Sequence, residues 1–495
     1  MPILPNNTTK IAEKAFSDAN LTAIDFESTS SIMSLGDYAF YGNREITTIK
    51  LSNNMTNISK GAFYNCDYLT TLTFGNNIKK IKKDAFTGCS SLKNIYYNGS
   101  LDDWLEIELS DISSHPCRYK ANLYFNNEPV TNITIADQIA YIRSFAFNNC
   151  DNLTSLIIGN NVGTIESYAF SSCSNLATIT IGNNLSMIKS KAFYQLPNLT
   201  SLTLGGVSYI GESAFSDCSN LSNITIGNLS YIASNAFYNC KKIETLYYNG
   251  DIDSWLDIDF KNADSNPCSA TKLYCNNILI EELTIPVNKT IIKPYALYGC
   301  TSLTSLTIPS SVTTIGNGAF SDCTSLTSLT ISGGVTVIGN SAFSGCTGLT
   351  SLTISDGVIT IGNNAFYGCH NLTNLTLGTG ITDIGDYAFY DCDYFSTLII
   401  PDTVIKIGEE TFAQCDTLQS VIIGSSVTTI GSGAFFSCWN LRDVTFKNKV
   451  TNIGDSAFYR CDELTTINVP WSEGEVVGAP WGATNATINY NYTGG

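Results

Sequence analysis

Histidine, the side chain most often used for proton transfer and metal binding near neutral pH, occurs only twice in these 495 residues. His370 occupies a position where related segments of the chain carry Thr, Ser or Asp. His115 precedes Pro116, where a second related segment has Asn266. Neither position requires an imidazole, so we expect both histidines to be surface residues. A Ser-His-Asp triad or an H-E-x-x-H metal site requires a histidine, and neither histidine is suitably placed for one. We therefore predict no catalytic residues and no enzyme activity.

Cysteine is the second candidate for chemistry, with 17 residues. Fourteen of them stand three positions after a recurring aromatic or leucine residue, and Ala19, Asn43 and Leu196 replace them in other copies. A position that accepts Ala or Leu is a packing position, and free Cys behaves as a small buried hydrophobe. We therefore predict reduced core cysteines and no metal or cofactor site, since metal spacing such as C-x-x-C is absent. Disulfides or metal ions between neighbouring copies are the alternative.

Acidic residues form the third candidate, in two similar stretches. One contains Asp251, Asp253, Asp257 and Asp259, and the other Asp102, Asp103, Glu106 and Glu108. Calcium sites need oxygen ligands that converge from a loop with a glycine bend, and neither stretch has one. We expect solvated faces of short helices, with calcium binding as the alternative. No pair of carboxylates stands out for glycoside hydrolysis.

The elements that must position these residues come from a repeat. Leu303, Leu326, Leu349 and Leu372 lie 23 residues apart, within a pattern L-x-x-L-x-I, V-x-x-I-G, A-F-x-x-C that recurs 17 times. Such a fixed period indicates a solenoid. The alternating L-x-x-L-x-I segment predicts one strand per repeat, paired in parallel with its neighbours. We predict an α/β solenoid of about 17 coils, curved and right-handed, with short helical turns on its convex side.

Two insertions interrupt the repeats and are copies of each other. They contain SLDDWLEIEL at 100–109 and DIDSWLDIDF at 251–260, each followed by Pro-Cys and an Asn-Asn turn. The spacing of Leu101, Trp104 and Leu105 predicts a short helix, and the Asn-Asn turn predicts a hairpin. We expect each insertion to protrude from an edge of the solenoid or to fold over it. Insertions in repeat arrays often carry the binding face, which makes Trp104 and Trp255 candidate contact residues.

The expected organisation follows from these breaks. The ranges are 1–97 for repeats with a truncated first copy, 98–129 for the first insertion, 130–248 for repeats, 249–279 for the second insertion, 280–469 for repeats and 470–495 for a C-terminal cap. Trp471 and Trp481 either cover the last coil or face a ligand. Leu4 and Pro5 align with the end of a strand, so we expect a missing N-terminal segment, with an export signal as one possibility.

Charge and hydropathy limit the classes of partner that the chain is expected to bind. The net charge is −17, and the 26 Lys and Arg residues form no basic run, which argues against nucleic acid and anionic membranes. No stretch approaches 18 consecutive apolar residues, so we expect no insertion into a membrane. We predict a monomer.

The candidate recognition surface is the solvent side of the strand ladder. Its side chains alternate with buried Leu and Ile, and the candidate residues are Ser305, Thr307, Ser328, Thr330, Ser351, Thr353, Asn374, Thr376, Arg442 and Asp443. Solenoid faces commonly bind proteins, which favours a hydroxyl-rich surface for a protein or glycan. The alternative is that Ser and Thr simply suit exposed strand positions.

The repeated motif closely resembles that of the BspA-like leucine-rich repeat family, also called the Treponema pallidum type, over nearly the whole chain. The insertions and the V-P-W-S-E-G tail look like those of such proteins from gut Firmicutes. The resemblance implies a leucine-rich repeat fold and a cell-surface or secreted protein; some family members bind host matrix and plasma proteins. We therefore expect an adhesin-like protein that binds an extracellular protein or glycan, with a structural spacer or stalk as the alternative.

Overall fold

The computed structural model describes residues 7–27, 31–268 and 271–493. The chain forms two compact units, Met1–Ile243 (unit 1) and Glu244–Gly495 (unit 2). Both units are parallel β-solenoids, and the chain has about 21 turns in all with very little helix. The predicted fold class is confirmed. The predicted positions of Leu4 and Pro5 lie outside the described residues.

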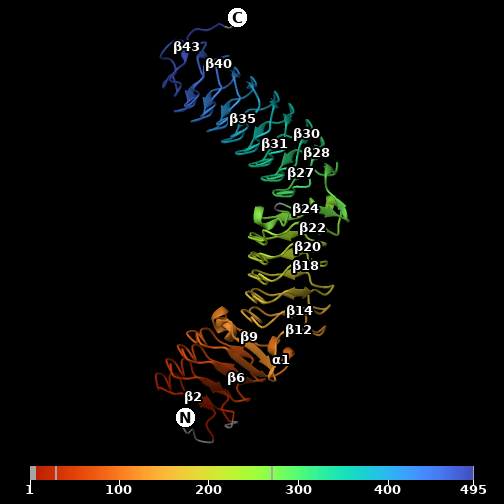
Figure 1. The fold of residues 1–495 in the computed structure, drawn as a ribbon, viewed down its shortest axis with the longest axis vertical. Helices are drawn as coiled ribbons and strands as arrows, with labels where there is room; N and C mark the ends of the chain where they lie inside the picture. The colour runs from red at the N-terminus through yellow and green to blue at the C-terminus, as the bar shows by residue number, and fades with distance from the viewer. Residues whose placement is uncertain (1–6, 28–30, 269–270, 494–495) are drawn as a thin grey trace. The chain divides into compact units, whose positions relative to one another are not determined.

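Each coil contributes one long strand to a parallel ladder. β28 and β30 pair in register, with Leu306 opposite Leu329, and Figure 1 shows them on successive coils. In unit 1 the long strands are β2 (Ala23–Asp25), β4 (Thr48–Lys50), β6 (Thr71–Gly75), β8 (Asn94–Asn98), β10 (Asn122–Phe125), β12 (Asn132–Ile135), β14 (Ser155–Ile158), β16 (Thr178–Thr180), β18 (Ser201–Leu204) and β20 (Asn223–Ile226). In unit 2 they are β22 (Thr245–Tyr248), β24 (Lys272–Cys275), β26 (Glu282–Thr284), β28 (Ser305–Ile308), β30 (Ser328–Ile331), β32 (Ser351–Thr353), β34 (Asn374–Thr376), β36 (Thr397–Ile399), β38 (Ser420–Ile423), β40 (Asp443–Phe446), β42 (Thr466–Asn468) and β43 (Thr487–Asn489). Their outward side chains form the strand-ladder face.

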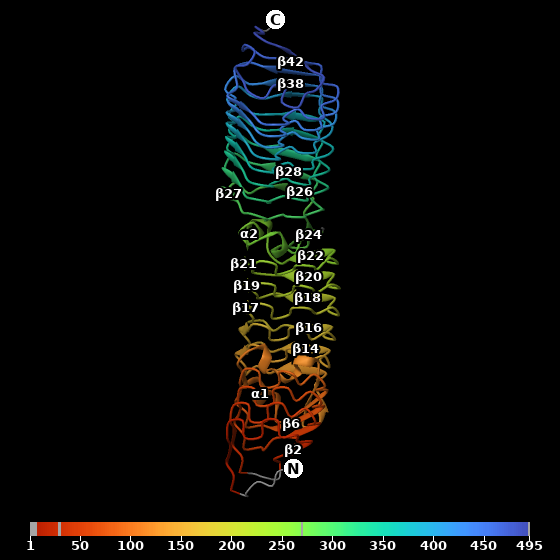
Figure 2. The same cartoon turned by 90° about the vertical axis from the view of Figure 1, so that its left-hand side faces the viewer.

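A second ladder of two-residue strands runs along another side of the same coils. Figure 2 separates the two ladders in unit 1, with β17, β19 and β21 on one side and β16, β18 and β20 on the other. In unit 1 the short strands are β1 (Lys10–Ile11), β3 (Ser34–Leu35), β5 (Asn57–Ile58), β7 (Lys80–Ile81), β9 (Glu108–Leu109), β13 (Tyr141–Ile142), β15 (Thr164–Ile165), β17 (Met187–Ile188), β19 (Tyr209–Ile210) and β21 (Tyr231–Ile232). In unit 2 they are β23 (Asp259–Phe260), β27 (Ile291–Ile292), β29 (Thr314–Ile315), β31 (Val337–Ile338), β33 (Thr360–Ile361), β35 (Asp383–Ile384), β37 (Lys406–Ile407), β39 (Thr429–Ile430) and β41 (Asn452–Ile453). Their outward side chains form the short-strand face.

The A-F-x-x-C segment forms hydrogen-bonded turns where short helical turns were predicted. Gly318 and Asp322 both have φ of +59°, and a residue in the left-handed region ends a right-handed helix. The amides freed by these turns bond to the next coil: Phe320 N–H donates to Ala342 O at 2.8 Å, and Asp322 N–H to Ser344 O at 2.7 Å. The turns therefore add a third ladder of hydrogen bonds between coils.

Phenylalanine rings and cysteine thiols fill the interior beneath these turns. Phe320 and Phe343 stack with ring centroids 5.2 Å apart, and the Cys346 thiol donates to Phe320 O at 3.2 Å. Twelve cysteines repeat this bond to the Phe or Leu carbonyl of the preceding coil. Where Asn43 replaces Cys, its amide donates to Phe16 O at 2.6 Å instead. All 17 cysteines are buried free thiols that serve packing and hydrogen bonding.

Each insertion contains the predicted short helix and hairpin, and it also contributes one strand to each ladder of the solenoid. In the first insertion β9 pairs with β7, β10 pairs with β8, and β11 (Glu128–Pro129) folds back antiparallel on β10. The remaining elements of the two insertions are α1 (Leu101–Leu105), η1 (Ile112–Ser114), η2 (Pro116–Tyr119), α2 (Ile252–Trp255), η3 (Ala263–Ser265) and β25 (Ile278–Leu279). The coil count of 17 was too low partly because each insertion adds a coil.

The segment after Val469 covers the last coil. β43 pairs with β42, and Trp481 O accepts the amide of Phe458 at 3.0 Å. Trp471 and Trp481 are buried, with their rings 6.5 Å apart. Their indoles therefore pack inside the molecule and offer no face to a ligand.

Candidate functional site

Trp104 and Trp255 are core residues, which corrects their prediction as contact residues of a binding surface. Their exposed fractions are 3% and 0%. Their indole N–H groups donate to Ala146 O and Ala296 O, each at 2.8 Å. In ordinary coils the matching Ala carbonyl accepts the Phe amide of the preceding coil, and the insertions have no such Phe. Each tryptophan replaces that donor because a buried carbonyl without a partner is costly.

His115 is also buried, at 0% exposure, so its prediction as a surface residue was wrong. Its Nδ1 accepts the amide of Cys117 at 3.0 Å, and its Nε2 lies 3.3 Å from Ala146 O. In the second insertion Asn266 makes the same two bonds through its amide, to Cys268 N at 2.9 Å and Ala296 O at 3.2 Å. Both residues tie an insertion to the following coil, a role the sequence could not show because Ala146 is 31 residues away.

A swap at this position tests that role. We expect His115→Asn to leave the unfolding temperature nearly unchanged, because Asn266 already makes both bonds in the other insertion. His115→Ala should cost about 1–3 kcal/mol, since it leaves the buried Cys117 amide without an acceptor. Thermal unfolding followed by circular dichroism measures both. Equal losses for the two variants would contradict a hydrogen-bonding role.

His115, Cys117 and Cys150 form one of two donor sets in the described residues whose atoms lie within 4.8 Å of one another. A histidine ligand binds metal through an unprotonated ring nitrogen. Here Nδ1 already accepts an amide, and Nε2 carries the proton because it faces a carbonyl oxygen. This set therefore holds no metal without losing the bonds that fix the insertion.

The second donor set, His370, Asp391 and Asp393, lies on the turns of three successive coils together with Asp416. His370 Nδ1 is 3.4 Å from Asp391 Oδ2 and 3.7 Å from Asp393 Oδ2. Partial burial, with the charges of Asp391 and Asp416, raises the pKa of Asp393 to about 6. Nitrogen and carboxylate ligands at such spacing could hold a divalent cation. A protonated His370 neutralises the same carboxylates as an ion pair.

The raised pKa of Asp393 predicts a pH dependence of stability. The folded protein holds this proton up to about pH 6, and the unfolded chain loses it near pH 4. Stability should therefore fall as the pH rises through this window. Asp393→Asn should remove that part of the slope and stabilise unit 2 at pH 7 by about 1 kcal/mol, after allowance for solvent screening. Unfolding temperatures from pH 4 to 7.5 measure it, and an unchanged slope would contradict the assignment.

The acidic residues in and just after α1 and α2 are partly exposed to solvent, as predicted, and some of them also form ion pairs with the following coil. Arg143 Nη2 lies 2.9 Å from Glu106. The half-buried Asp253 and the exposed Asp257 bind Lys289 Nζ at 2.8 and 2.6 Å, and the Lys289 side chain is only 10% exposed. These pairs hold each insertion helix to the coil that follows it.

The strand-ladder face of unit 2 carries the remaining predicted residues. Six are exposed, namely Ser328, Thr330, Ser351, Thr353, Asn374 and Thr376. Ser305 and Thr307 are half-buried on the neighbouring strand β28. Arg442 is exposed, and the half-buried Asp443 accepts a hydrogen bond from Ser420 Oγ at 2.8 Å. The exposed hydroxyl and amide groups thus form one column across β30, β32 and β34.

This column ends in a groove of about 530 Å³ between β34 and β36. The two strands belong to separate hydrogen-bonded sheets, and Leu375 is half-buried where Leu306 and Leu352 are fully buried. Phe395 occupies the buried position that Leu372 and Leu418 hold in neighbouring coils. The groove also divides the ladder next to Thr376.

Both apolar and charged side chains line the groove. Ile399, 60% exposed, lies beside Thr376 and Thr397. Lys447 Nζ bridges two coils to Asp402 at 3.1 Å and fixes one edge. The Ser425 amide and Lys447 lower the pKa of Asp402, so its carboxylate stays charged near neutral pH.

Two tyrosine pairs on the strand-ladder face were not predicted as site residues. Tyr96 and Tyr124 stack at 4.7 Å, and Tyr247 and Tyr274 at 4.9 Å, each pair joining an insertion strand to its neighbour. All four are half-buried. The repeated Y-Y-N-G and L-Y phrases contained the signal, because their first tyrosines align with outward strand positions.

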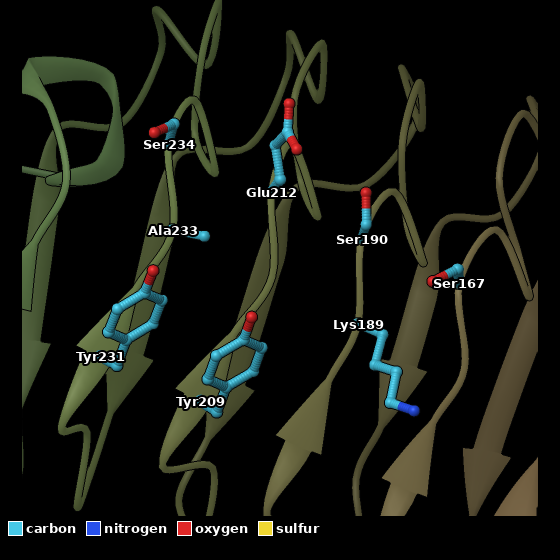
Figure 3. A pocket seen from close by; sticks show the side chains of 8 residues that line it. All are labelled: Ser167, Lys189, Ser190, Tyr209, Glu212, Tyr231, Ala233 and Ser234. Carbon is cyan, nitrogen blue, oxygen red and sulfur yellow. The ribbon is translucent and has the colours of Figure 1, made fainter.

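A further groove, of about 540 Å³, lies on the short-strand face of unit 1. Figure 3 shows Tyr209 and Tyr231 side by side from successive coils, with Glu212 and Ser234 on the adjoining turns. The two rings are parallel at 5.1 Å, so each covers one face of the other. Lys189 on its floor is paired with Glu166 at 2.7 Å. This groove offers ring edges and hydroxyl groups.

These features define a parallel β-solenoid of the leucine-rich repeat class. The chain matches the family described as BspA type Leucine rich repeat region (6 copies) over residues 2–106, 120–244, 270–394 and 359–476, and it belongs to that family. BspA-type proteins are generally surface-exposed or secreted, and proteins built from such repeats are typically non-enzymatic binding modules. No helix in the described ranges is long and apolar enough to cross a bilayer.

Several solved structures with similar coils come from bacteria. A leucine rich cell surface protein from Faecalibacterium prausnitzii is 23% identical, covers 76% of this chain and 87% of its own, and has a TM-score of 0.40. A leucine-rich repeat protein from Bacteroides ovatus is 20% identical over 93% and 88% of the two chains, with a TM-score of 0.34. The T. pallidum leucine rich repeat protein is 25% identical over 37% and 78%, with a TM-score of 0.30. No curated protein matches this chain.

Proposed function

We propose that this chain is an adhesin-like, non-enzymatic binding protein that recognises an extracellular protein or glycan through the strand-ladder face of unit 2. The observation that carries the proposal is the exposed column on β30, β32 and β34 that leads into the groove at Ile399. Family membership supports a surface or secreted location. The second insertion contributes Tyr274, which stacks on Tyr247 of the neighbouring strand of unit 2, since its tryptophan Trp255 lies in the core.

The chemistry of this face suits a polar macromolecule with an apolar anchor. Hydrogen-bonded strands such as β32 and β34 lie about 4.8 Å apart, so their outward Ser, Thr and Asn side chains present closely spaced donors and acceptors. Ile399 supplies apolar surface in the groove, and Lys447 with Asp402 supplies charged groups. Protein interfaces combine apolar surface with polar groups. The net charge of −17 disfavours nucleic acid as a partner.

Binding to an array of extracellular matrix proteins, plasma proteins and glycans tests the proposal. The site variant is Thr330→Arg with Thr376→Arg, two outward positions two coils apart on the strand-ladder face. The matched control is Ile291→Arg with Val337→Arg, also two coils apart, on the short-strand face, where both residues are exposed. We expect the site variant to bind at least about tenfold more weakly, because buried interface centres dominate affinity, and the control to bind normally.

The alternative function is a spacer or stalk that displays another domain. The regular Ser and Thr positions are compatible with this alternative, because these residues suit exposed strand positions whether or not a ligand binds there. Equal binding by the two arginine variants would exclude the strand-ladder face, and absence of any binding would favour the spacer.

A further inference from the structure

The thiol of Cys150 departs from the pattern of the cysteine column. Twelve thiols donate to the backbone carbonyl of the recurring Phe or Leu in the preceding coil, as Cys346 does with Phe320 O. The coil before Cys150 is the first insertion, which has no such residue at that place. The Cys150 thiol instead points at Cys117 Sγ, 3.2 Å away. Two sulfur atoms thus meet where the ladder lacks its usual acceptor.

The surroundings of this pair favour reaction at sulfur. Both cysteines are fully buried, and the His115 ring lies beside them, with Nδ1 held by the Cys117 amide. Burial raises the pKa of the Cys117 thiol, and the hydrogen bond from Cys150 is the largest effect that lowers it. The thiolate is the form that attacks a disulfide.

The second insertion provides a contrast within the same chain. Cys268 and Cys300 occupy the matching sequence positions, but Asn266 replaces the imidazole. The Cys300 thiol shares a hydrogen bond with Ser302 Oγ at 3.5 Å. Burial raises the pKa of Cys268 well above its ordinary value, and the neighbouring Cys300 adds a smaller increase. Elsewhere in the column, thiols on successive coils are also neighbours, yet they donate to carbonyl groups.

We propose that Cys117 and Cys150 are a modification site that forms a disulfide by exchange with a small-molecule disulfide such as oxidised glutathione. The Cys117 thiolate attacks one sulfur of the reagent, forms a mixed disulfide and releases one glutathione thiolate. Cys150, after loss of its proton, attacks the Cys117 sulfur and releases the second glutathione. The protein loses two thiol hydrogens, and the reagent is reduced to two glutathione molecules.

The crosslink would lock the first insertion to the coil that follows it. It joins residues 33 positions apart and so restricts the unfolded chain. Oxidation is therefore expected to raise the unfolding temperature of unit 1 by several degrees, and a thiol reductant should reverse the change. The reagent reaches Cys117 only during a brief local opening of the insertion, because both sulfur atoms are buried. What favours this pair is that re-closing brings the two sulfur atoms together, 3.2 Å apart in the closed structure.

The test is incubation of the full chain with oxidised glutathione, followed by alkylation under denaturing conditions and peptide mapping by mass spectrometry. We expect two of the 17 thiols to escape alkylation and one crosslinked peptide pair to contain Cys117 and Cys150. Cys117→Ser and Cys150→Ser should each abolish the crosslink, and Cys268→Ser should retain it. If a serine variant fails to fold, the peptide map of the wild-type chain still tests the proposal, because it shows directly which cysteines are crosslinked.

Three results would overturn the proposal. Alkylation of all 17 thiols would show that no bond forms. Crosslinks spread along the column, or found equally at Cys268 and Cys300, would show that this pair is not special. A stable glutathione adduct on Cys117 alone would show that Cys150 does not reach the sulfur.

Discussion

Replacing Trp255 with alanine is expected to destabilise unit 2 by about 3–5 kcal/mol, the usual cost of emptying a large buried aromatic site. Trp255 is 0% exposed and packs against Tyr248 and Phe260, with ring centroids 5.2 and 5.4 Å away. Its indole N–H also donates a hydrogen bond to Ala296 O. In the alanine variant Ala296 O would accept only the longer hydrogen bond from Asn266. Thermal unfolding of the full chain measures the effect.

The chain supplies matched controls for this substitution. Trp439 is 40% exposed, so Trp439→Ala should change stability by about 0.5 kcal/mol or less. Trp255→Phe keeps most of the ring but loses the N–H. Its loss of stability should therefore lie between the losses of Trp255→Ala and Trp439→Ala. Similar losses at Trp255 and Trp439 would contradict the assignment of Trp255 to the core.

Phe343→Ala is expected to cost a similar amount, about 3–5 kcal/mol, because it breaks the stack of rings beneath the turns. The ring of Phe343 lies 5.2 Å from that of Phe320 and 5.3 Å from that of Phe366. Coils of a solenoid contact only their neighbours, so the loss should concentrate in the adjoining coils. Hydrogen exchange should show faster opening near Phe343 and little change in unit 1.

Tyr367→Ala is the comparison for this prediction. Tyr367 also stacks on a residue of the next coil, Tyr390 at 5.0 Å, but it is 38% exposed. Its removal should cost about 1 kcal/mol or less, since an exposed ring buries little area. A loss as large as that of Phe343→Ala would mean that stacking itself, and not burial, holds the coils together.

The coil architecture was predictable because the same side chains return every 23 residues. Leu306, Ile308 and Ile315 point inward by the period of a strand, and their copies must stack if any one coil is to be buried. The turns were harder to predict. Positions such as Asp322 and Ser341 adopt positive φ without being glycine, because the amides of those residues bond to the next coil.

The insertions and the groove were beyond reach for a different reason. A helical pattern at Leu101, Trp104 and Leu105 indicates an apolar face, but not whether that face meets a ligand or the next coil. The role of His115 depends on Ala146, and the groove depends on residues of coils as far apart as Leu375 and Lys447. Such roles arise from contacts between coils, and a local pattern carries no information about them.

The most direct test of the proposed binding face is hydroxyl-radical footprinting of the chain with and without a ligand found on the array. Ile399 lies in the groove and is 60% exposed, whereas Ile405 is 48% exposed beside the short strand β37. Both should oxidise readily in the free protein. We predict that the ligand slows oxidation of Ile399 at least about threefold, as expected of a residue at a buried interface centre, and leaves Ile405 unchanged. Protection of Ile405 with Ile399 still reactive would contradict recognition through the strand-ladder face.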